Sequence, residues 1–195
     1  MFDFTDKVAL LTGAGVGIGA SAAKAYARDG AKVAVNSVSG SGKKLAEEIE
    51  KEGGKALFVQ GDVSKPEEVE SMIKATVEEF GKLDIVVNCA GIVSGGSVEE
   101  MDLDLWNRVM DVNVTGTFLV CKYAMPHLRK TRGVIVNVAS LVAVKGIANR
   151  AVYSASKGAV LALSKAMAAD HIKDGIRVNV VSPGTVLSPS LEQRI

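Results

Sequence analysis

A tyrosine precedes a lysine by four residues in the segment AVYSASKGAV, and this spacing could support proton chemistry. Positions i and i+4 share one face of a helix, so Tyr153 and Lys157 would point the same way. The residues between them, SAS, are small and leave room for another molecule against that face. A lysine ammonium about 5 Å away, at an effective dielectric constant of about 20, favours a phenolate by about 3 kcal/mol. An isolated pair of this kind is more often two surface residues, so the rest of the sequence must decide.

The composition is that of an ordinary globular domain. The chain has 195 residues, of which 48% are hydrophobic and 23% charged, so it can bury one sizeable core. The net charge is +1 with both signs scattered, which argues against nucleic-acid and membrane-surface partners. No apolar run approaches the ~20 residues that a membrane span needs. We therefore expect a single domain over residues 1–195.

The cysteines and histidines give no sign of a metal site. Cys89 and Cys121 have neither CxxC nor metal-type spacing, and His127 and His171 stand alone. The start of the chain, MFDFTDKVALLTG, has two acids before its first lysine, unlike a signal peptide. We predict no metal, and buried free thiols in a reducing cytoplasm.

Short apolar runs rich in β-branched residues alternate with longer amphipathic runs. Apolar runs without strict alternation are typical of strands buried on both faces of a parallel sheet. The alternation predicts a doubly wound α/β sheet with helices on both faces, hence three layers. Ser64 is a predicted N-cap, because Pro66 follows it in a first helical turn. The expected strands are 8–12, 32–36, 56–60, 85–88, 134–138 and 177–181, and the expected helices are 17–29, 42–52, 66–80, 103–113, 115–130 and 153–173.

The first expected strand leads directly into a glycine-rich turn, TGAGVGIGASAAKAYA. Gly13, Gly17 and Gly19 follow the pattern TGxxxGxG where this strand turns into a helix. Glycine permits the tight turn and lets the backbone approach a pyrophosphate, whose charge suits a helix N-terminus. This placement favours dinucleotide binding over an ordinary tight turn.

The glycine spacing resembles that of the single-domain branch of the short-chain dehydrogenase/reductase family. The likeness continues in order along nearly the whole chain. NCAG matches the family's NNAG motif with cysteine in second place. The later family motifs follow at the expected positions, as MDVNVTG, VNVAS, YSASK and SPG. The resemblance implies a Rossmann fold and hydride transfer between a nicotinamide and a secondary alcohol or ketone.

The resemblance also implies a role for each matched residue. Tyr153 would exchange the proton at the substrate oxygen, and Lys157 would assist it and bind the nicotinamide ribose. Ser140 would hydrogen-bond the substrate oxygen, and Asn113 would hold a water that relays protons. The residues implied for the cofactor are Gly13, Gly17, Ile18, Gly19, Ser37, Asp62, Val63, Asn88, Ala90, Gly91, Tyr153, Lys157, Pro183, Gly184 and Val186.

Two alternatives stay open at this point. A catalytically silent dinucleotide sensor would keep the fold, but such proteins usually lose one of the four catalytic residues, and all four are present. An epimerase or dehydratase of the family's extended branch has a differently spaced glycine turn and a longer chain.

The end of the second strand bears on the choice of cofactor. The NAD-preferring pattern places an acid there to bind the adenosine ribose, and this chain has Ser37 at that position. Asn36, Ser37 and Ser39 could hydrogen-bond a 2′-phosphate, so NADP is slightly favoured over NAD. Val16 argues against this preference, because the NADP pattern often carries a basic residue there.

Two segments, VKGIANRAVYSASKGAV and GIRVNVVSPGTVLSPSLEQRI, resemble a narrower group within the family. This group includes cytosolic 3-hydroxybutyrate, L-fucose and deoxy-sugar-acid dehydrogenases. Arg150 and Arg194 in these segments could bind a carboxylate in bidentate fashion, which suits a hydroxy acid or sugar-derived substrate. The alternatives are surface arginines paired with acids such as Glu192, and a 3-oxoacyl-carrier reductase. The expected substrate-binding residues are Ser140, Arg150, Tyr153 and Arg194.

The last expectations concern the C-terminal segment and assembly. The sequence ends at SPGTVLSPSLEQRI, where the family usually continues into a helical lid and a last strand, so we expect both to be absent from this chain. The family commonly forms tetramers through two long helices, which correspond to residues 115–130 and 153–173. The second contains GAVLALSKAMAA, which is more apolar than one buried face requires. We expect a homotetramer.

Overall fold

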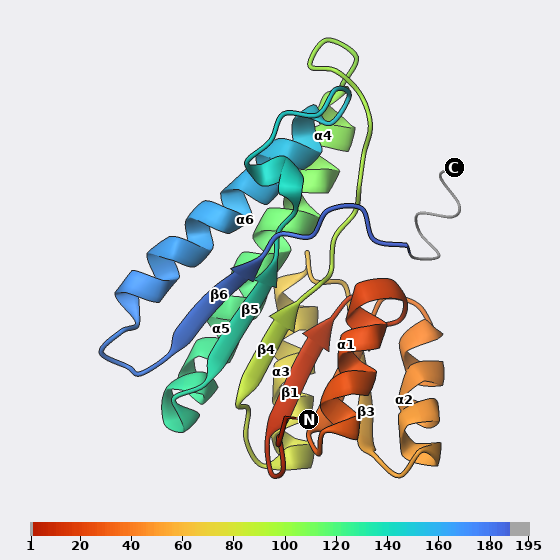
Figure 1. Cartoon of the computed structure of the whole chain (residues 1–195), viewed down its shortest axis with the longest axis vertical. Helices are drawn as coiled ribbons and strands as arrows, with labels where there is room; N and C mark the ends of the chain where they lie inside the picture. The colour runs from red at the N-terminus through yellow and green to blue at the C-terminus, as the bar shows by residue number, and fades with distance from the viewer. Residues whose placement is uncertain (1, 188–195) are drawn as a thin grey trace.

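The computed structural model describes residues 2–187, and six parallel strands form its single sheet in the order β3-β2-β1-β4-β5-β6 (Figure 1). The chain builds outward from β1 to β3 and then returns to the other side of β1, which places β4 to β6 there. This order confirms the expected doubly wound sheet. The strands are β1 (Val8–Thr12), β2 (Lys32–Ser37), β3 (Lys55–Gln60), β4 (Ile85–Asn88), β5 (Val134–Val138) and β6 (Arg177–Val181).

Helices cover both faces of the sheet, as the pattern predicts. Two helices, α1 and α2, lie over β1 to β3 on one face, and α3, α5 and α6 lie on the other face (Figure 1). A 3-10 turn, η2 (Leu141–Ala143), follows β5. The helices are α1 (Gly17–Arg28), α2 (Ser41–Lys51), α3 (Pro66–Phe80), α4 (Leu103–Met110), α5 (Gly116–Thr131) and α6 (Ala151–Asp170).

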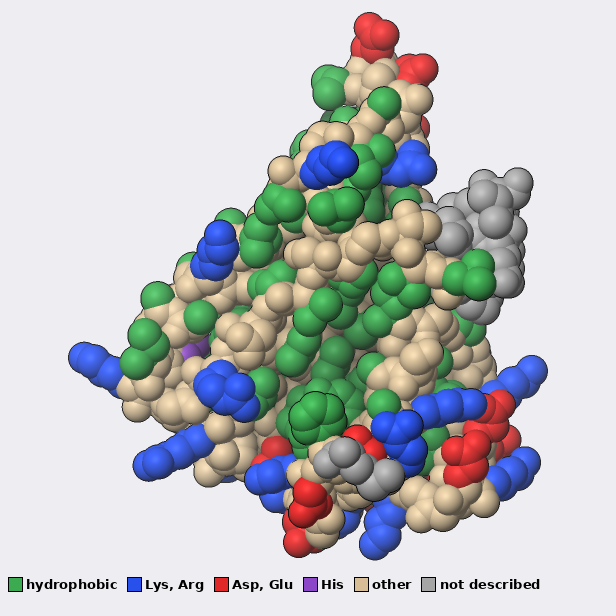
Figure 2. Space-filling model, viewed as in Figure 1, with side chains coloured by type: hydrophobic (Ala, Val, Ile, Leu, Met, Phe, Trp, Pro, Cys, Tyr) green, Lys and Arg blue, Asp and Glu red, His purple; other side chains and the backbone are tan. Residues whose placement is uncertain are grey.

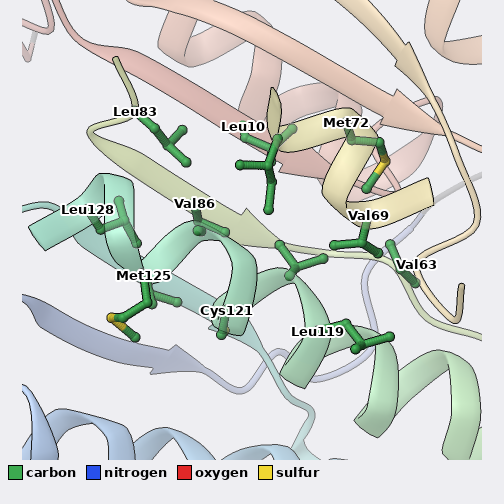
Figure 3. Close-up of a cluster of buried hydrophobic side chains, with 14 of the residues drawn as sticks. Leu10, Val63, Val69, Met72, Leu83, Val86, Leu119, Cys121, Met125 and Leu128 are labelled. Atoms are coloured by element: carbon green, nitrogen blue, oxygen red, sulfur yellow. The ribbon is translucent and has the colours of Figure 1, made fainter. Parts of the chain in front are cut away.

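Alternate residues of β1 enter different hydrophobic cores, which explains its unbroken apolar sequence. Val8 and Leu10 pack into the cluster beneath α3 and α5, part of which Figure 3 shows. Ala9 and Leu11 pack into the cluster beneath α1 and α2. All four residues are fully buried, so each face of the strand contributes hydrophobic stabilisation.

One half of the sheet is covered on a single face within residues 2–187. No helix of the described chain lies over β5 and β6 on the side of α1 (Figure 1). Val134, Val136 and Val138 of β5 are only half-buried there, and hydrophobic side chains gather in this region of the surface (Figure 2). The helical lid and last strand, which we expect to be absent from this chain, would fall at or after residue 188, and that expectation lies outside the described residues.

The largest local departure from the predicted elements concerns the helices 103–113 and 115–130. A π-helical turn, η1 (Asp111–Thr115), joins α4 to α5, so the two expected helices form one continuous helical run. A turn of this kind inserts an extra residue and often marks a functional site.

The expected N-cap of α3 is also wrong. Lys65 occupies the cap position without a side-chain hydrogen bond. The Ser64 hydroxyl instead donates to Asp62 Oδ1 at 2.7 Å, because that carboxylate lies two residues away and accepts the Ser64 backbone N–H as well.

Within residues 2–187 no helix is both long and apolar enough to cross a membrane. The same described residues contain no cluster of His, Cys, Asp and Glu that could hold a metal ion. Cys89 and Cys121 are free thiols, half-buried and buried respectively. Burial raises the pKa of Cys89 to about 11 and that of Cys121 to about 12.

Candidate active site

The carboxyl ends of the parallel strands meet at one edge of the sheet, where a buried polar chain runs across three of them. Asn88 of β4 lies opposite Thr12 and Asn137 in the strand register. Its amide donates to Asn137 Oδ1 at 2.8 Å, and Asn137 in turn donates to the Ser164 hydroxyl of α6 at 2.7 Å. Asn88 is 4% exposed, so its side chain braces the sheet beneath the site. The predicted contact of Asn88 with a cofactor could therefore involve only its backbone.

The glycine-rich turn packs against the end of β4 more closely than any side chain would allow. A Cβ atom on Gly13 would lie 2.5 Å from the Ala90 Cα, and the backbone φ of Gly13 is +58°. A Cβ on Gly19 would lie 2.7 Å from the Gly13 carbonyl oxygen. Both positions therefore require glycine, and the turn leaves its backbone accessible to a ligand.

Two hollows bring most of the predicted cofactor residues together. The first, of about 260 Å³, lies between the ends of β1, β2, β3 and β4. The second, of about 530 Å³, lies beside the start of α1 and the segment after β6. Of the predicted residues, Gly13, Ser37, Asp62, Val63, Ala90 and Gly91 line the first, and Gly17, Ile18, Pro183 and Val186 line the second.

Asn36 also lines the first hollow, but the polar groups of its side chain already form hydrogen bonds within the protein. Its amide donates to the carbonyls of Val59 and Gly61, each at 3.0 Å, and accepts from the Gly13 N–H at 3.3 Å. Asn36 is 1% exposed. The expectation that it could bind a 2′-phosphate is therefore wrong, because its N–H groups already hold β2 against the end of β3.

The serines that follow Asn36 form a hydroxyl-rich wall of the same hollow. The Ser37 hydroxyl accepts the Gly42 N–H at 3.0 Å near the start of α2, and donates to the Ser39 carbonyl at 2.5 Å. The Ser39 and Ser41 hydroxyls lie 2.9 Å apart. This wall carries no carboxylate.

Asp62, one of the residues implied for the cofactor, lies opposite an arginine that the sequence analysis did not single out. Arg108 Nη2 of α4 lies 3.4 Å from Asp62 Oδ2, although 46 residues separate the two along the chain. Burial acts to raise the pKa of Asp62, but hydrogen bonds from Ser64 and the charge of Arg108 outweigh it, so the pKa is lowered. No local pattern signals this pair, because it forms only when α4 reaches the end of β3.

Tyr153 and Lys157 lie on one face of α6, as their spacing predicts. The Lys157 Nζ is 5.9 Å from the centroid of the Tyr153 ring and donates to the Val138 carbonyl at 2.8 Å. Lys157 is 5% exposed, and this burial lowers its pKa to about 8. Ser140 follows β5 in extended backbone and caps η2 by accepting the Val142 N–H at 3.4 Å.

Asn113 lies in the middle of η1 and is fully buried. Its amide forms a reciprocal pair with the backbone of Ile92, accepting the N–H at 2.8 Å and donating to the carbonyl at 3.0 Å. A Cβ on Gly91 would lie 3.1 Å from Asn113 Oδ1 and 3.4 Å from Lys157 Nζ. The loop after β4 therefore brings Asn113 and Lys157 to the same glycine.

Arg150 lies at the start of α6, where two loops meet. Its backbone forms a parallel bridge with Gly96, and its Nη1 donates to the Asn149 carbonyl at 2.7 Å. It forms no ion pair with any acid of residues 2–187. Arg194 and Glu192, which also entered the substrate hypothesis, lie outside the described residues.

A small apolar hollow of about 180 Å³ lies where α4 meets the start of α6. Trp106 of α4 and Ala151 of α6 form part of its lining. Asp102 begins α4 by accepting the Leu105 N–H at 2.7 Å, which fixes this helix beside the hollow.

Comparison with known proteins agrees with this geometry. The family model described as short chain dehydrogenase matches residues 7–194. An uncharacterized oxidoreductase of Thermotoga maritima is 49% identical over 195 residues, which cover 99% of this chain and 77% of that protein. The trans-4-hydroxycyclohexanecarboxylate dehydrogenase of Sinomonas cyclohexanicum is 42% identical over 191 residues, covering 94% of this chain and 74% of that protein.

A solved structure shows the same fold. The crystal structure of a dehydrogenase/reductase from Sinorhizobium meliloti 1021 superposes with a TM-score of 0.92 at 36% identity. The match covers 96% of this chain and 75% of the other.

The chain belongs to the short-chain dehydrogenase/reductase family. It is an oxidoreductase that transfers a hydride between a nicotinamide cofactor and a secondary alcohol or ketone.

Proposed function

We propose that Asn113, Ser140, Tyr153 and Lys157 carry out the proton chemistry of this oxidoreductase. The observation that carries the proposal is a buried lysine one helical turn from a tyrosine, with 5.9 Å between the ammonium and the ring centroid. The Tyr153 phenolate takes the proton of the substrate alcohol during oxidation and becomes the phenol, which returns the proton during reduction. The Lys157 charge stabilises the phenolate in surroundings where water screens it poorly.

Ser140 and Asn113 complete the site. The Ser140 hydroxyl follows β5 beside the catalytic helix and stabilises charge that develops on the substrate oxygen. Both N–H groups of the Asn113 amide are already used in hydrogen bonds, so a proton-relaying water would have to be held by its free acceptor capacity.

The two hollows at the strand ends support a bound dinucleotide. Gly13 and Gly19 leave no room for a Cβ, so the turn presents backbone N–H groups at the start of α1 to a pyrophosphate. The adenosine half would occupy the hollow that Ser37 and Asp62 line, and the nicotinamide half would lie toward Pro183 and Val186. When bound, the nicotinamide supplies or accepts the hydride.

NADP is the proposed cofactor, by a small margin over NAD. The paired Ser39 and Ser41 hydroxyls leave one proton to donate to a 2′-phosphate, whereas the Ser37 hydroxyl already donates to the Ser39 carbonyl; the wall holds no carboxylate that would repel the phosphate. Asp62 also lines this hollow, but Arg108 neutralises part of its charge.

The proposed substrate is a hydroxy acid or a sugar-derived acid. Arg150 forms no ion pair with an acid of residues 2–187 and lies three residues before Tyr153. A guanidinium in this position could hold a carboxylate while Tyr153 acts on a hydroxyl. The relative from Sinomonas cyclohexanicum, named for a substrate with both groups, supports this class.

We also propose a cytoplasmic homotetramer. Phe118 of α5 is 45% exposed, and the exposed face of α6 carries the small residues Ala155, Ala162 and Ala166. Small residues allow close approach of two helices, and an exposed phenylalanine gains from burial. The free thiols Cys89 and Cys121 suit a reducing compartment. Light scattering at micromolar concentration tests the assembly, and a monomer would contradict it.

The proposed chemistry is tested by Tyr153→Phe, which removes one hydroxyl. Turnover should fall by about 10²–10⁴-fold or more, because the proton acceptor is lost. Cofactor binding, followed by fluorescence titration, should survive. Tyr123→Phe, at a half-buried tyrosine of α5, is the matched control and should retain turnover. Retained turnover in Tyr153→Phe would contradict the proposal.

A further inference from the structure

Two buried serines on α6 make the same pair of hydrogen bonds, eight residues apart. The Ser156 hydroxyl donates to the Tyr153 carbonyl at 2.8 Å and accepts from Asn113 Nδ2 at 3.0 Å. The Ser164 hydroxyl donates to the Val160 carbonyl at 2.6 Å and accepts from Asn137 Nδ2 at 2.7 Å. Ser156 is 0% exposed and Ser164 is 1% exposed. Each serine therefore satisfies one buried asparagine, but only Ser156 does so beside the proposed catalytic residues.

The bond between Asn113 and Ser156 has a fixed direction. The reciprocal pair with Ile92 sets which end of the Asn113 amide is oxygen and which is nitrogen. The second N–H of the amide then points to the Ser156 hydroxyl. The hydroxyl proton of Ser156 then points to the Tyr153 carbonyl. Both N–H groups of the Asn113 amide and the O–H of Ser156 are therefore used as donors.

The Ser156 oxygen consequently joins η1 to α6, and the Asn113 amide extends this connection to the loop after β4. Asn113 ties η1 to Ile92 in the loop after β4, and Ser156 ties η1 to the turn of α6 that bears both Tyr153 and Lys157. Asn113 and Ser156 are both fully buried, so water has little access to replace a lost bond between them.

We propose that Ser156 is a positioning residue of the reaction, whose hydroxyl holds the Tyr153–Lys157 turn of α6 in register with Asn113. The inference rests on the proposed function, because it assumes that Tyr153 and Lys157 act on the substrate proton. Removal of the hydroxyl leaves an Asn113 N–H buried without a partner. The π-turn or α6 then shifts to recover one, and the separation of the ammonium from the phenol changes.

The matched pair Ser156→Ala and Ser164→Ala tests this role, because both remove a buried hydroxyl from the same helix and orphan an asparagine N–H. Both should lower the melting temperature to a similar extent. Ser156→Ala should also lower kcat for alcohol oxidation about tenfold or more, with KM changed less than about twofold. The pH at which kcat rises should move upward by about half a unit, because the lysine charge no longer holds its place beside the phenol. Ser164→Ala should keep the wild-type kcat and pH profile.

Ser156→Thr keeps the hydroxyl and is expected to recover most of the wild-type kcat. Should Ser156→Ala fail to fold, Ser156→Cys and Ser164→Cys give the same comparison, because a thiol fills the space but accepts hydrogen bonds weakly.

A kcat and pH profile of Ser156→Ala that match those of Ser164→Ala would overturn the positioning role. A Ser156→Thr variant as impaired as Ser156→Ala would overturn the hydrogen-bond explanation too. If either result were obtained and Tyr153→Phe were inactive, the positioning role would fail but the proposed function would still hold. Turnover in Tyr153→Phe would instead refute the proposed function itself.

Discussion

The ammonium of Lys157 donates a hydrogen bond to the backbone carbonyl of Val138 at 2.8 Å, and this bond ties α6 to the last residue of β5. The lysine is almost completely buried, and burial lowers its pKa to about 8 from an ordinary value of 10.5. The fold therefore holds a cation where water stabilises it poorly. The burial that suits Lys157 to its proposed catalytic role also makes its charge costly to the folded state.

Lys157→Met should therefore stabilise the protein at pH 7, by roughly 2 kcal/mol. Between pH 8 and 10.5 the unfolded chain binds the lysine proton more fully than the folded chain does, so the stability of the wild type rises with pH there. The advantage of Lys157→Met should shrink over that range. Urea unfolding of both proteins at pH 7, 8, 9 and 10 measures the difference in their free energies of unfolding. Lys165→Met, at an exposed lysine of the same helix, is the control. An advantage that stays constant with pH would argue against a charged, poorly solvated lysine.

Gly19→Ala should destabilise the fold and weaken cofactor binding. The added methyl group would lie 2.7 Å from the Gly13 carbonyl oxygen and 2.8 Å from the Ala14 Cα, both of them backbone atoms that cannot move without opening the turn. We expect a loss of about 1–3 kcal/mol in the free energy of unfolding. Gly146→Ala is the control, because nothing lies within 4 Å of its Cβ position, and it should stabilise slightly or have no effect. Equal effects of the two substitutions would refute the close-packed turn.

The elements of the fold were largely predictable from the sequence because local patterns determine them. Four strands, including β1 and β4, begin and end at the predicted residues, since apolar β-branched runs bounded by turn residues specify a strand buried on both faces. The glycine turn was predictable for a similar reason, because its backbone geometry admits few other residues.

The features that sequence reasoning missed depend on residues far apart along the chain. The π-turn at Asn113 is held by Ile92 and Ser156, which are 21 and 43 residues away. Asn36 is a polar residue in a strand, and only the packed structure shows its amide bound to Val59 and Gly61. The Arg108–Asp62 pair likewise forms only in the folded chain.

Ser37→Asp should shift cofactor preference from NADP toward NAD. A carboxylate at this position would face the proposed 2′-phosphate in the hydroxyl-lined hollow. Repulsion between two charges at about 6 Å should weaken NADPH binding at least about tenfold. Fluorescence titration with NADPH and NADH measures the change, and Ser37→Asn is the uncharged control. A wild-type protein that strongly prefers NADH would contradict the proposed cofactor.

Arg150→Met should raise KM for an anionic hydroxy acid far more than KM for a neutral alcohol of the same shape. A charge-assisted hydrogen bond contributes roughly 1.5–3 kcal/mol, so the difference should be about ten- to a hundredfold. Steady-state kinetics with trans-4-hydroxycyclohexanecarboxylate and its uncharged primary amide test this, since the Sinomonas cyclohexanicum relative is named for that acid. Equal effects on the two compounds would remove Arg150 from carboxylate recognition.

Trp106 is the single tryptophan of the sequence, and it lies in the apolar hollow between α4 and the start of α6. Trp106 is 37% exposed, so the emission of its indole depends on how that junction is packed and hydrated. Excitation of this one fluorophore consequently gives an optical signal from the N-terminal end of α6 without any added label. Stopped-flow spectroscopy could thus resolve how quickly this junction responds when a cofactor or a candidate substrate is added.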